Sequence, residues 1–168
     1  YAAYKGTRVK ADQELYDQIP RVKELLSAFN IPIYEKEGFE ADDCIGTIVK
    51  NCHEHNDKCL NIPADGLEVY IVSGDKDIYQ LIDGNIFVYS LRKGLSQMAV
   101  VDRKVIKEEY NLDPEDFIDL KALAGDPSDN IPGVPGIGPK TATDLIQKFD
   151  TLEKLYEQIK LRIKNYEL

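Results

Sequence analysis

The stretch LEVYIVSGDKD, residues 67–77, decides the fold class of this 168-residue chain. Its first seven residues are rich in β-branched side chains and almost continuously apolar, which is typical of a strand covered on both faces of a parallel sheet. A second apolar run, IFVY at residues 86–89, predicts another strand. Because helical patterns alternate with such strands, the sequence predicts an α/β fold with a parallel sheet.

Two helical patterns precede this stretch. Residues 12–29 carry apolar side chains at steps of three and four, which indicates an amphipathic helix that ends at NIP, residues 30–32. Residues 33–35 are a short extended candidate. Residues 41–53 form the second helical pattern, and its predicted inner face consists of Ile45, Ile48, Val49 and Cys52.

The rest of the chain is predicted to be helical. Asp102 is a suitable N-cap, and a Pro/Gly-rich stretch separates the later helices. The predicted helices cover residues 102–110, 113–125, 141–149 and 151–158. We therefore divide the chain into an α/β part, residues 1–102, and a helical part, residues 103–168.

The net charge of −9 argues against a broad basic surface for nucleic acid. The strength of this argument depends on where the acids lie, because carboxylates that gather around Mg²⁺ are neutralised by the metal and then favour the binding of phosphate. The distribution of the acids therefore matters more than their sum.

The cysteines and the N-terminus indicate a reduced, cytoplasmic environment. Three cysteines fit no common disulfide framework, and the sequence shows neither an export signal nor an apolar run long enough to cross a membrane. Zinc ligation by residues 52–55 (CHEH) with Cys59 is the alternative, weighed against a helix end that runs into a polar loop.

Seven carboxylates gather in three short segments. They are Glu40, Asp42 and Asp43, then Asp75 and Asp77, then Asp126 and Asp129. The first group begins a helix, where capping and the helix dipole also favour acids. The second follows a strand at the edge where open sheets place ligands, and both of its acids point to one side if the chain stays extended, although a solvated turn is the alternative. Such groups suit Mg²⁺ or Mn²⁺, and two such ions can cleave a phosphodiester.

A glycine-rich turn leads into the helix at residues 141–149. Its pattern, Gly133-x-x-Gly136-x-Gly138-x-Lys140, has the form of a helix–hairpin–helix whose backbone N–H groups can hold a phosphate oxygen. A purely structural turn remains the alternative. The dinucleotide-binding fingerprint is excluded, because neither its glycine order nor its preceding strand is present.

The N-terminus carries a small basic group, with Lys5, Arg8 and Lys10 beside Tyr1 and Tyr4. The tyrosines are suited to stack on bases. A solvated, frayed terminus is the alternative.

Together these sequence motifs resemble those of the 5′-nuclease (flap endonuclease) superfamily, and most closely those of the 5′→3′ exonuclease domain of bacterial DNA polymerase I. The resemblance covers nearly the whole chain and rests on YKGTR (4–8), EADD (40–43), GDKD (74–77) with QL (80–81), and the string from residue 125 to residue 142. It implies a partial PIN-like, 5′-nuclease parallel sheet with flanking helices, followed by a helix–hairpin–helix (helix-3-turn-helix) region.

The resemblance also implies two divalent ions, Mg²⁺ or Mn²⁺. The residues that look like ligands of the first site are Glu40, Asp42 and Asp43, with Asp75 between the sites. The residues that look like the second site or its water shell are Asp77, Asp126 and Asp129.

The remaining implied roles concern DNA. Lys5 and Arg8 match catalytic residues at the base of the family's helical arch, where they orient the scissile phosphate and stabilise charge on it. The matching duplex-binding element, which can also hold a K⁺ ion, comprises Gly133, Gly136, Gly138, Lys140 and Thr141. The implied reaction is hydrolysis of DNA at 5′ flaps, nicks or gaps, on the nucleoid in the cytoplasm. A polymerase domain linked to this chain in the parent protein is a candidate partner that the resemblance leaves open.

One departure from the family pattern is large. Family members begin with a strand that ends in an Asp, and a further Asp precedes the arch, but this chain starts after both. We therefore expect a fragment that binds metal weakly and cleaves DNA slowly or not at all.

Two other functions remain open. The first is a non-catalytic DNA-binding module that uses the hairpin while the acids are only surface charge. The second is a Mg²⁺-dependent phosphatase with Asp75 as covalent nucleophile, which would explain neither the hairpin nor the acids at residues 40–43.

Overall fold

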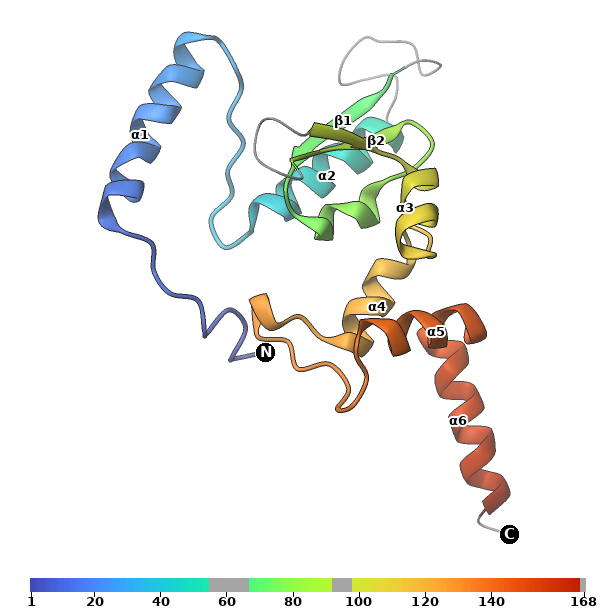
Figure 1. Ribbon diagram of the computed structural model, residues 1–168. Coiled ribbons are helices and arrows are strands. Elements are labelled where there is room, and N and C mark those ends of the chain that lie inside the picture. Colours follow the sequence, from blue (N-terminus) through green and yellow to red (C-terminus); the bar gives the residue numbers. More distant parts are fainter. Residues whose placement is uncertain (55–66, 92–97, 167–168) are drawn as a thin grey trace.

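A small three-stranded sheet and a set of helices make up the protein, whose computed structural model describes residues 1–54, 67–91 and 98–166 (Figure 1). The α/β part contains α1 (Gln13–Ala28), α2 (Ala41–Glu54), β1 (Val69–Ser73), the 3₁₀ helix η1 (Lys76–Leu81), β2 (Ile86–Leu91) and β3 (Met98–Val101). The helical part contains α3 (Arg103–Tyr110), α4 (Asp116–Ala124), η2 (Pro127–Asp129), α5 (Pro139–Phe149) and α6 (Leu152–Tyr166). No helix in these described ranges is long and apolar enough to cross a membrane.

The sheet has the order β1-β2-β3 and is mixed. β1 and β2 are parallel, with Val69 opposite Ile86, which confirms the predicted parallel pair. Residues 74–85 connect them and contain η1, so the connection has the dozen residues that a parallel crossover needs. The antiparallel strand β3 was not predicted, because its four residues are too few to show a clear period.

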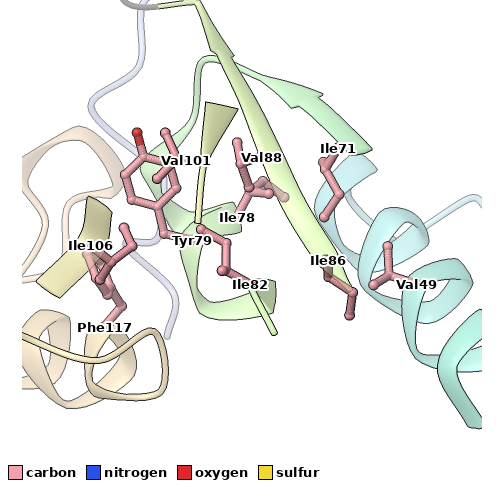
Figure 2. Packing of buried hydrophobic residues seen from close by; sticks show 10 residues of the cluster. All are labelled: Val49, Ile71, Ile78, Tyr79, Ile82, Ile86, Val88, Val101, Ile106 and Phe117. Carbon is pink, nitrogen blue, oxygen red and sulfur yellow. The ribbon is translucent and has the colours of Figure 1, made fainter. Parts of the chain in front are cut away.

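The main core lies where the sheet meets η1 and three helices. Figure 2 shows its ten buried side chains, which are Val49, Ile71, Ile78, Tyr79, Ile82, Ile86, Val88, Val101, Ile106 and Phe117. The Tyr79 ring of η1 packs edge-on against Tyr110 of α3 and Phe117 of α4. This packing holds η1, and with it the acids at the end of β1, against the helical part.

A second, smaller core joins α4 to the last two helices. Its buried residues are Leu112, Leu123, Ala142 and Ile146. The predicted helices of this part are confirmed with shifted ends, since α4 begins at Asp116 and α6 continues to Tyr166 instead of ending at residue 158. The main core also includes Ile106 and Phe117, so it extends past residue 102, and the division of the chain at that residue stays a prediction.

Helix α1 is confirmed, but it stands away from the sheet in Figure 1 and buries none of its residues. Leu15, Val22 and Leu25 are 53–57% exposed, although their spacing predicted a packed face. An ion pair between Lys23 and Glu35, at 2.6 Å, links α1 to the returning segment. Residues 33–35, the short extended candidate, belong to no helix or strand and lie in the segment that connects α1 to α2.

Candidate metal centre and nucleic-acid interface

A closed loop between α4 and the hairpin holds two of the predicted acids. Asp126 caps η2, and its Oδ1 accepts hydrogen bonds from the Ser128 N–H (2.9 Å) and hydroxyl (2.6 Å). The Asp126 and Ile131 backbones exchange hydrogen bonds of 2.9 and 2.8 Å, so the loop closes on itself. Asp129 follows within this loop and is only 8% exposed.

The base of this loop requires glycine. Gly125 and Gly133 both have positive φ, at 76° and 63°. Their backbones lie so close that a Cβ on Gly133 would be 2.3 Å from the Gly125 nitrogen. The closed loop itself therefore requires glycine at position 133, independently of the predicted role of Gly133 in DNA binding.

Asp77 reaches the same place from the other part of the fold. The extended course considered for residues 74–77 is wrong, because the chain turns into η1 after β1. Asp75 caps η1 by accepting a hydrogen bond from the Asp77 N–H at 3.0 Å. This turn directs Asp77 toward the closed loop. Carboxylate oxygens of Asp77, Asp126 and Asp129 all lie within 4.8 Å of one another, and we call these three residues the Asp129 cluster.

Two cations of the chain neutralise much of the Asp129 cluster. The Lys121 ammonium contacts Asp77 and lies 2.5 Å from an Asp126 oxygen, while the Arg8 guanidinium contacts Asp129. The hydrogen bond from Lys121 lowers the pKa of Asp126 from 3.8 to about 2, with further help from Ser128. Burial alone would lower the pKa of Lys121, but its hydrogen bonds to Asp126 and Asp77 outweigh burial and raise it.

The other acids meet beside this cluster at the start of α2. Glu40 pairs with Lys5, and its backbone N–H donates to the Asp43 carboxylate at 2.9 Å, so Asp43 serves to cap the helix. Burial raises the pKa of Asp42, and the charges of Asp75, Asp77 and Glu40 raise it further. We call Glu40, Asp42 and Asp75 the Glu40 group.

A hollow of about 310 Å³ adjoins both sets of acids. It is lined by Asp42 and Asp43 of α2 and by Asp77 of η1. Asp42 of this helix start has its pKa raised by burial and by the charges of Asp75 and Asp77. The helix start and the strand end therefore meet through Asp42.

The N-terminal segment is docked on the closed loop. The Asn130 amide donates to the Ala3 carbonyl at 2.7 Å, the Lys5 N–H donates to the Asp129 carbonyl at 2.9 Å, and the Tyr4 hydroxyl donates to Asp129 at 3.2 Å. The frayed terminus that we considered is therefore wrong for this segment. Lys5 and Arg8 both end beside the acids.

The hairpin presents an exposed helix start. Gly136 turns the chain with φ of 83°, and Gly138 is the N-cap of α5 with open space around its Cα. Lys140 and Thr141 in the first turn are exposed, as a phosphate-binding helix start requires. The predicted hairpin followed by a helix is confirmed, and its binding role stays a prediction.

The sequence missed Lys121, which links the α/β and helical parts through its two ion pairs. The only signal was a lysine in the last turn of a predicted helix, just before Gly125 and Asp126. The alternative zinc ligands include His55 and Cys59, which lie outside the described residues.

Comparison with known sequences and structures gives this arrangement a family. Residues 1–111 match the 5′-3′ exonuclease N-terminal resolvase-like domain, and residues 112–168 match the 5′-3′ exonuclease C-terminal SAM fold. The chain belongs to the 5′-3′ exonuclease family. This confirms the resemblance drawn from the sequence strings.

The relatives include much longer proteins. DNA polymerase I of Bacillus subtilis (strain 168) is 46% identical over 159 residues, which cover 95% of this chain and 17% of the relative. DNA polymerase I of Chloroflexus aurantiacus is 39% identical over 170 residues, covering 99% of this chain and 17% of that protein. The chain thus spans about a sixth of the length of these relatives.

Among solved structures, T5 5′-exonuclease with bound zinc ions superposes with a TM-score of 0.72 at 28% identity, covering 94% of this chain and 57% of that chain. The catalytic core of Rad2 in complex with a DNA substrate gives a TM-score of 0.55 at 25% identity, covering 95% of this chain and 44% of that one. The α/β fold with a helical region is therefore shared with 5′-nucleases.

Proposed function

We propose that this chain is the nuclease part of a longer protein and carries a divalent-metal-dependent 5′→3′ exonuclease or flap endonuclease activity on DNA junctions. The observation that carries the proposal is the meeting of Asp77, Asp126 and Asp129 from two parts of the fold, with Arg8 beside them. Asp129 is buried and Asp77 and Asp126 are partly buried, so surface charge alone gives no reason for them to converge, because a carboxylate removed from water needs compensation.

The donor set of the Asp129 cluster fits Mg²⁺ or Mn²⁺. Both ions take hard oxygen ligands, and the cluster offers three carboxylates, of which Asp129 is buried. The T5 enzyme was solved with zinc bound, which supports a divalent ion at this fold. The Glu40 group, with Asp43 as a further candidate, would hold the first ion.

Divalent ions at these acids would supply an activated water and charge neutralisation at the scissile phosphate. The protein's own side chains would position the substrate. Lys5 and Arg8 lie beside the acids and would orient a phosphodiester and stabilise the charge that develops on it. Asp77, Asp126 and Asp129 hold their positions through η1 and the closed loop, so that little reorganisation is needed when substrate arrives.

The hairpin would bind the duplex side of the junction. The backbone N–H groups at the start of α5, with Lys140, would hold a phosphate without reading the base sequence. Carbonyl groups of the hairpin would provide the K⁺ site. The DNA polymerase I relatives support a linked polymerase domain. Action on nucleoid DNA in the cytoplasm is part of the same proposal.

Replacement of one acid separates a nuclease from a binding module. We expect Asp75→Asn to abolish Mn²⁺-dependent cleavage of a 5′-flap duplex, measured in single turnover with excess protein. Junction binding, measured by fluorescence anisotropy in Ca²⁺, should stay within about twofold, because a neutral amide removes no phosphate contact. Glu108→Gln, an exposed acid on α3, is the matched control and should change neither.

The opposite pattern would favour the non-catalytic module. Tight junction binding together with equal Mn²⁺ binding by Asp75→Asn and the control would contradict a nuclease, because a nuclease needs Asp75 to hold its metal ion. The phosphatase alternative predicts a phosphoaspartyl intermediate at Asp75 with a small phosphate ester and no dependence on the hairpin.

A further inference from the structure

Lys121 lies inside the proposed metal site. It comes from the last turn of α4, and its ammonium contacts an oxygen of Asp77 and lies 2.5 Å from one of Asp126. Among the described residues it is the one cation that bridges two of the three acids in the Asp129 cluster. Arg8, from the N-terminal segment, contacts only the third acid, Asp129.

We infer that Lys121 is the internal counter-ion of the Asp129 cluster and that it must withdraw before a divalent cation can bind there. This inference rests on the proposed metal site. An ammonium between Asp77 and Asp126 uses the oxygens that a metal ion would use, and two cations cannot share them without strong repulsion. Lys121 therefore competes with the metal and keeps the acids together in its absence.

The surroundings of Lys121 give it room to move. Its side chain is 33% exposed and lines a hollow of about 340 Å³ whose walls include Phe117, Ile118 and Ile131. The apolar walls suit the aliphatic stem, and lysine is a point charge on a flexible stem that can move while keeping its charge near solvent. The acids, by contrast, are held by η1 and the closed loop.

Competition of this kind lowers the apparent affinity for the metal. Only molecules in which Lys121 has already withdrawn can bind the metal ion, so the apparent affinity is the intrinsic affinity multiplied by the fraction of such molecules. Removal of the ammonium should therefore tighten binding. We expect Lys121→Met, which keeps the length of the stem, to bind Mn²⁺ about tenfold more tightly than the unmodified chain, with free Mn²⁺ measured by electron paramagnetic resonance.

Two controls isolate the local effect. Lys104→Met also removes one positive charge, but from a side chain on α3 that is 81% exposed, and it should shift Mn²⁺ affinity by less than about twofold. In an Asp126→Asn background, Lys121→Met should lose most of its gain. Equal or weaker Mn²⁺ binding by Lys121→Met would overturn the inference, and so would a full gain in the Asp126→Asn background.

Folding provides a second readout that does not depend on activity. In EDTA, Lys121→Met should melt at a lower temperature than the unmodified chain, because two acids lose their counter-ion, and Mn²⁺ should raise its melting temperature by more. If the variant is unfolded in EDTA, Mn²⁺ or the added Asp126→Asn change should restore folding, and failure of both would contradict the inference.

The two proposals fail in different ways. If Asp126→Asn leaves Mn²⁺ binding unchanged, the metal site itself is wrong and Lys121 cannot compete for it. If Asp126→Asn weakens Mn²⁺ binding but Lys121→Met does not tighten it, the metal site stands and only the role of Lys121 is wrong.

Discussion

The Asp129 cluster and the Glu40 group contain three acids each, but they differ in the backbone that supports them and in their counter-ions. Two acids of the Asp129 cluster sit on a closed loop with a glycine base, and Lys121 and Arg8 neutralise much of the cluster. The Glu40 group stands at a helix start and a strand end, and its one ion pair among the described residues is between Lys5 and Glu40. One set is pre-organised and nearly neutral, whereas the other keeps an excess of negative charge.

The difference shows in the two acids whose pKa values shift in opposite directions. Lys121 lowers the pKa of Asp126, whereas burial and neighbouring carboxylates raise that of Asp42. An acid with its own counter-ion stabilises the fold without metal. An acid that faces other acids destabilises the fold until a cation arrives, so the Glu40 group has more to gain from a metal ion.

The largest effect should come from breaking the base of the closed loop. Gly133→Ala places a Cβ 2.3 Å from the Gly125 nitrogen at a positive φ, and we expect it to lower the free energy of unfolding by about 3 kcal/mol. Gly74→Ala is the matched change beside the Glu40 group, where nothing lies within 4 Å, and it should cost less than about 1 kcal/mol. Urea unfolding followed by circular dichroism measures both, and equal losses would show that the loop is no more rigidly built than the strand end.

A smaller effect should appear in the dependence of stability on pH. Because the pKa of Asp126 is lowered from 3.8 to about 2, its contribution is complete above pH 4 and is lost as the pH falls through 2. We expect Asp126→Asn to be less stable than the unmodified chain by about 1 to 2 kcal/mol at pH 7 in EDTA, with the difference vanishing near pH 2. A difference that stayed constant from pH 7 to pH 2 would mean that the ion pair with Lys121 contributes nothing.

The smallest effect should have the opposite sign. Because the pKa of Asp42 is raised, its charged form is disfavoured in the folded protein, and the destabilisation is present above the folded pKa and vanishes below 3.8. Asp42→Asn should therefore stabilise the chain at pH 7 in EDTA, by roughly 0.5 kcal/mol or less. Saturating Mn²⁺ should remove this advantage, because the variant lacks a ligand, and thermal melts with and without Mn²⁺ compare the two conditions. If Asp42→Asn were instead less stable than the unmodified chain in EDTA, Asp42 would be stabilised by a nearby cation, as Asp126 is by Lys121.

Much of this protein follows from local sequence patterns. The parallel pair β1 and β2, the helices and the hairpin were predictable because period, capping residues and glycine placement act over a few neighbouring residues. The strings around Glu40, Asp75 and Asp126 also identified the family. The antiparallel strand β3 was not predictable, since four residues carry too little pattern.

Local sequence patterns were sufficient to identify the seven carboxylates predicted to bind metal and the glycine-rich turn of the hairpin. Only the tertiary structure decided that Asp77 leaves the strand direction to join Asp126 and Asp129, that Asp43 caps a helix, and that Lys121 lies among the acids. These facts depend on how η1, α4 and the closed loop pack together. Contacts between residues that are far apart in the chain depend on packing across the whole core, which no local pattern encodes.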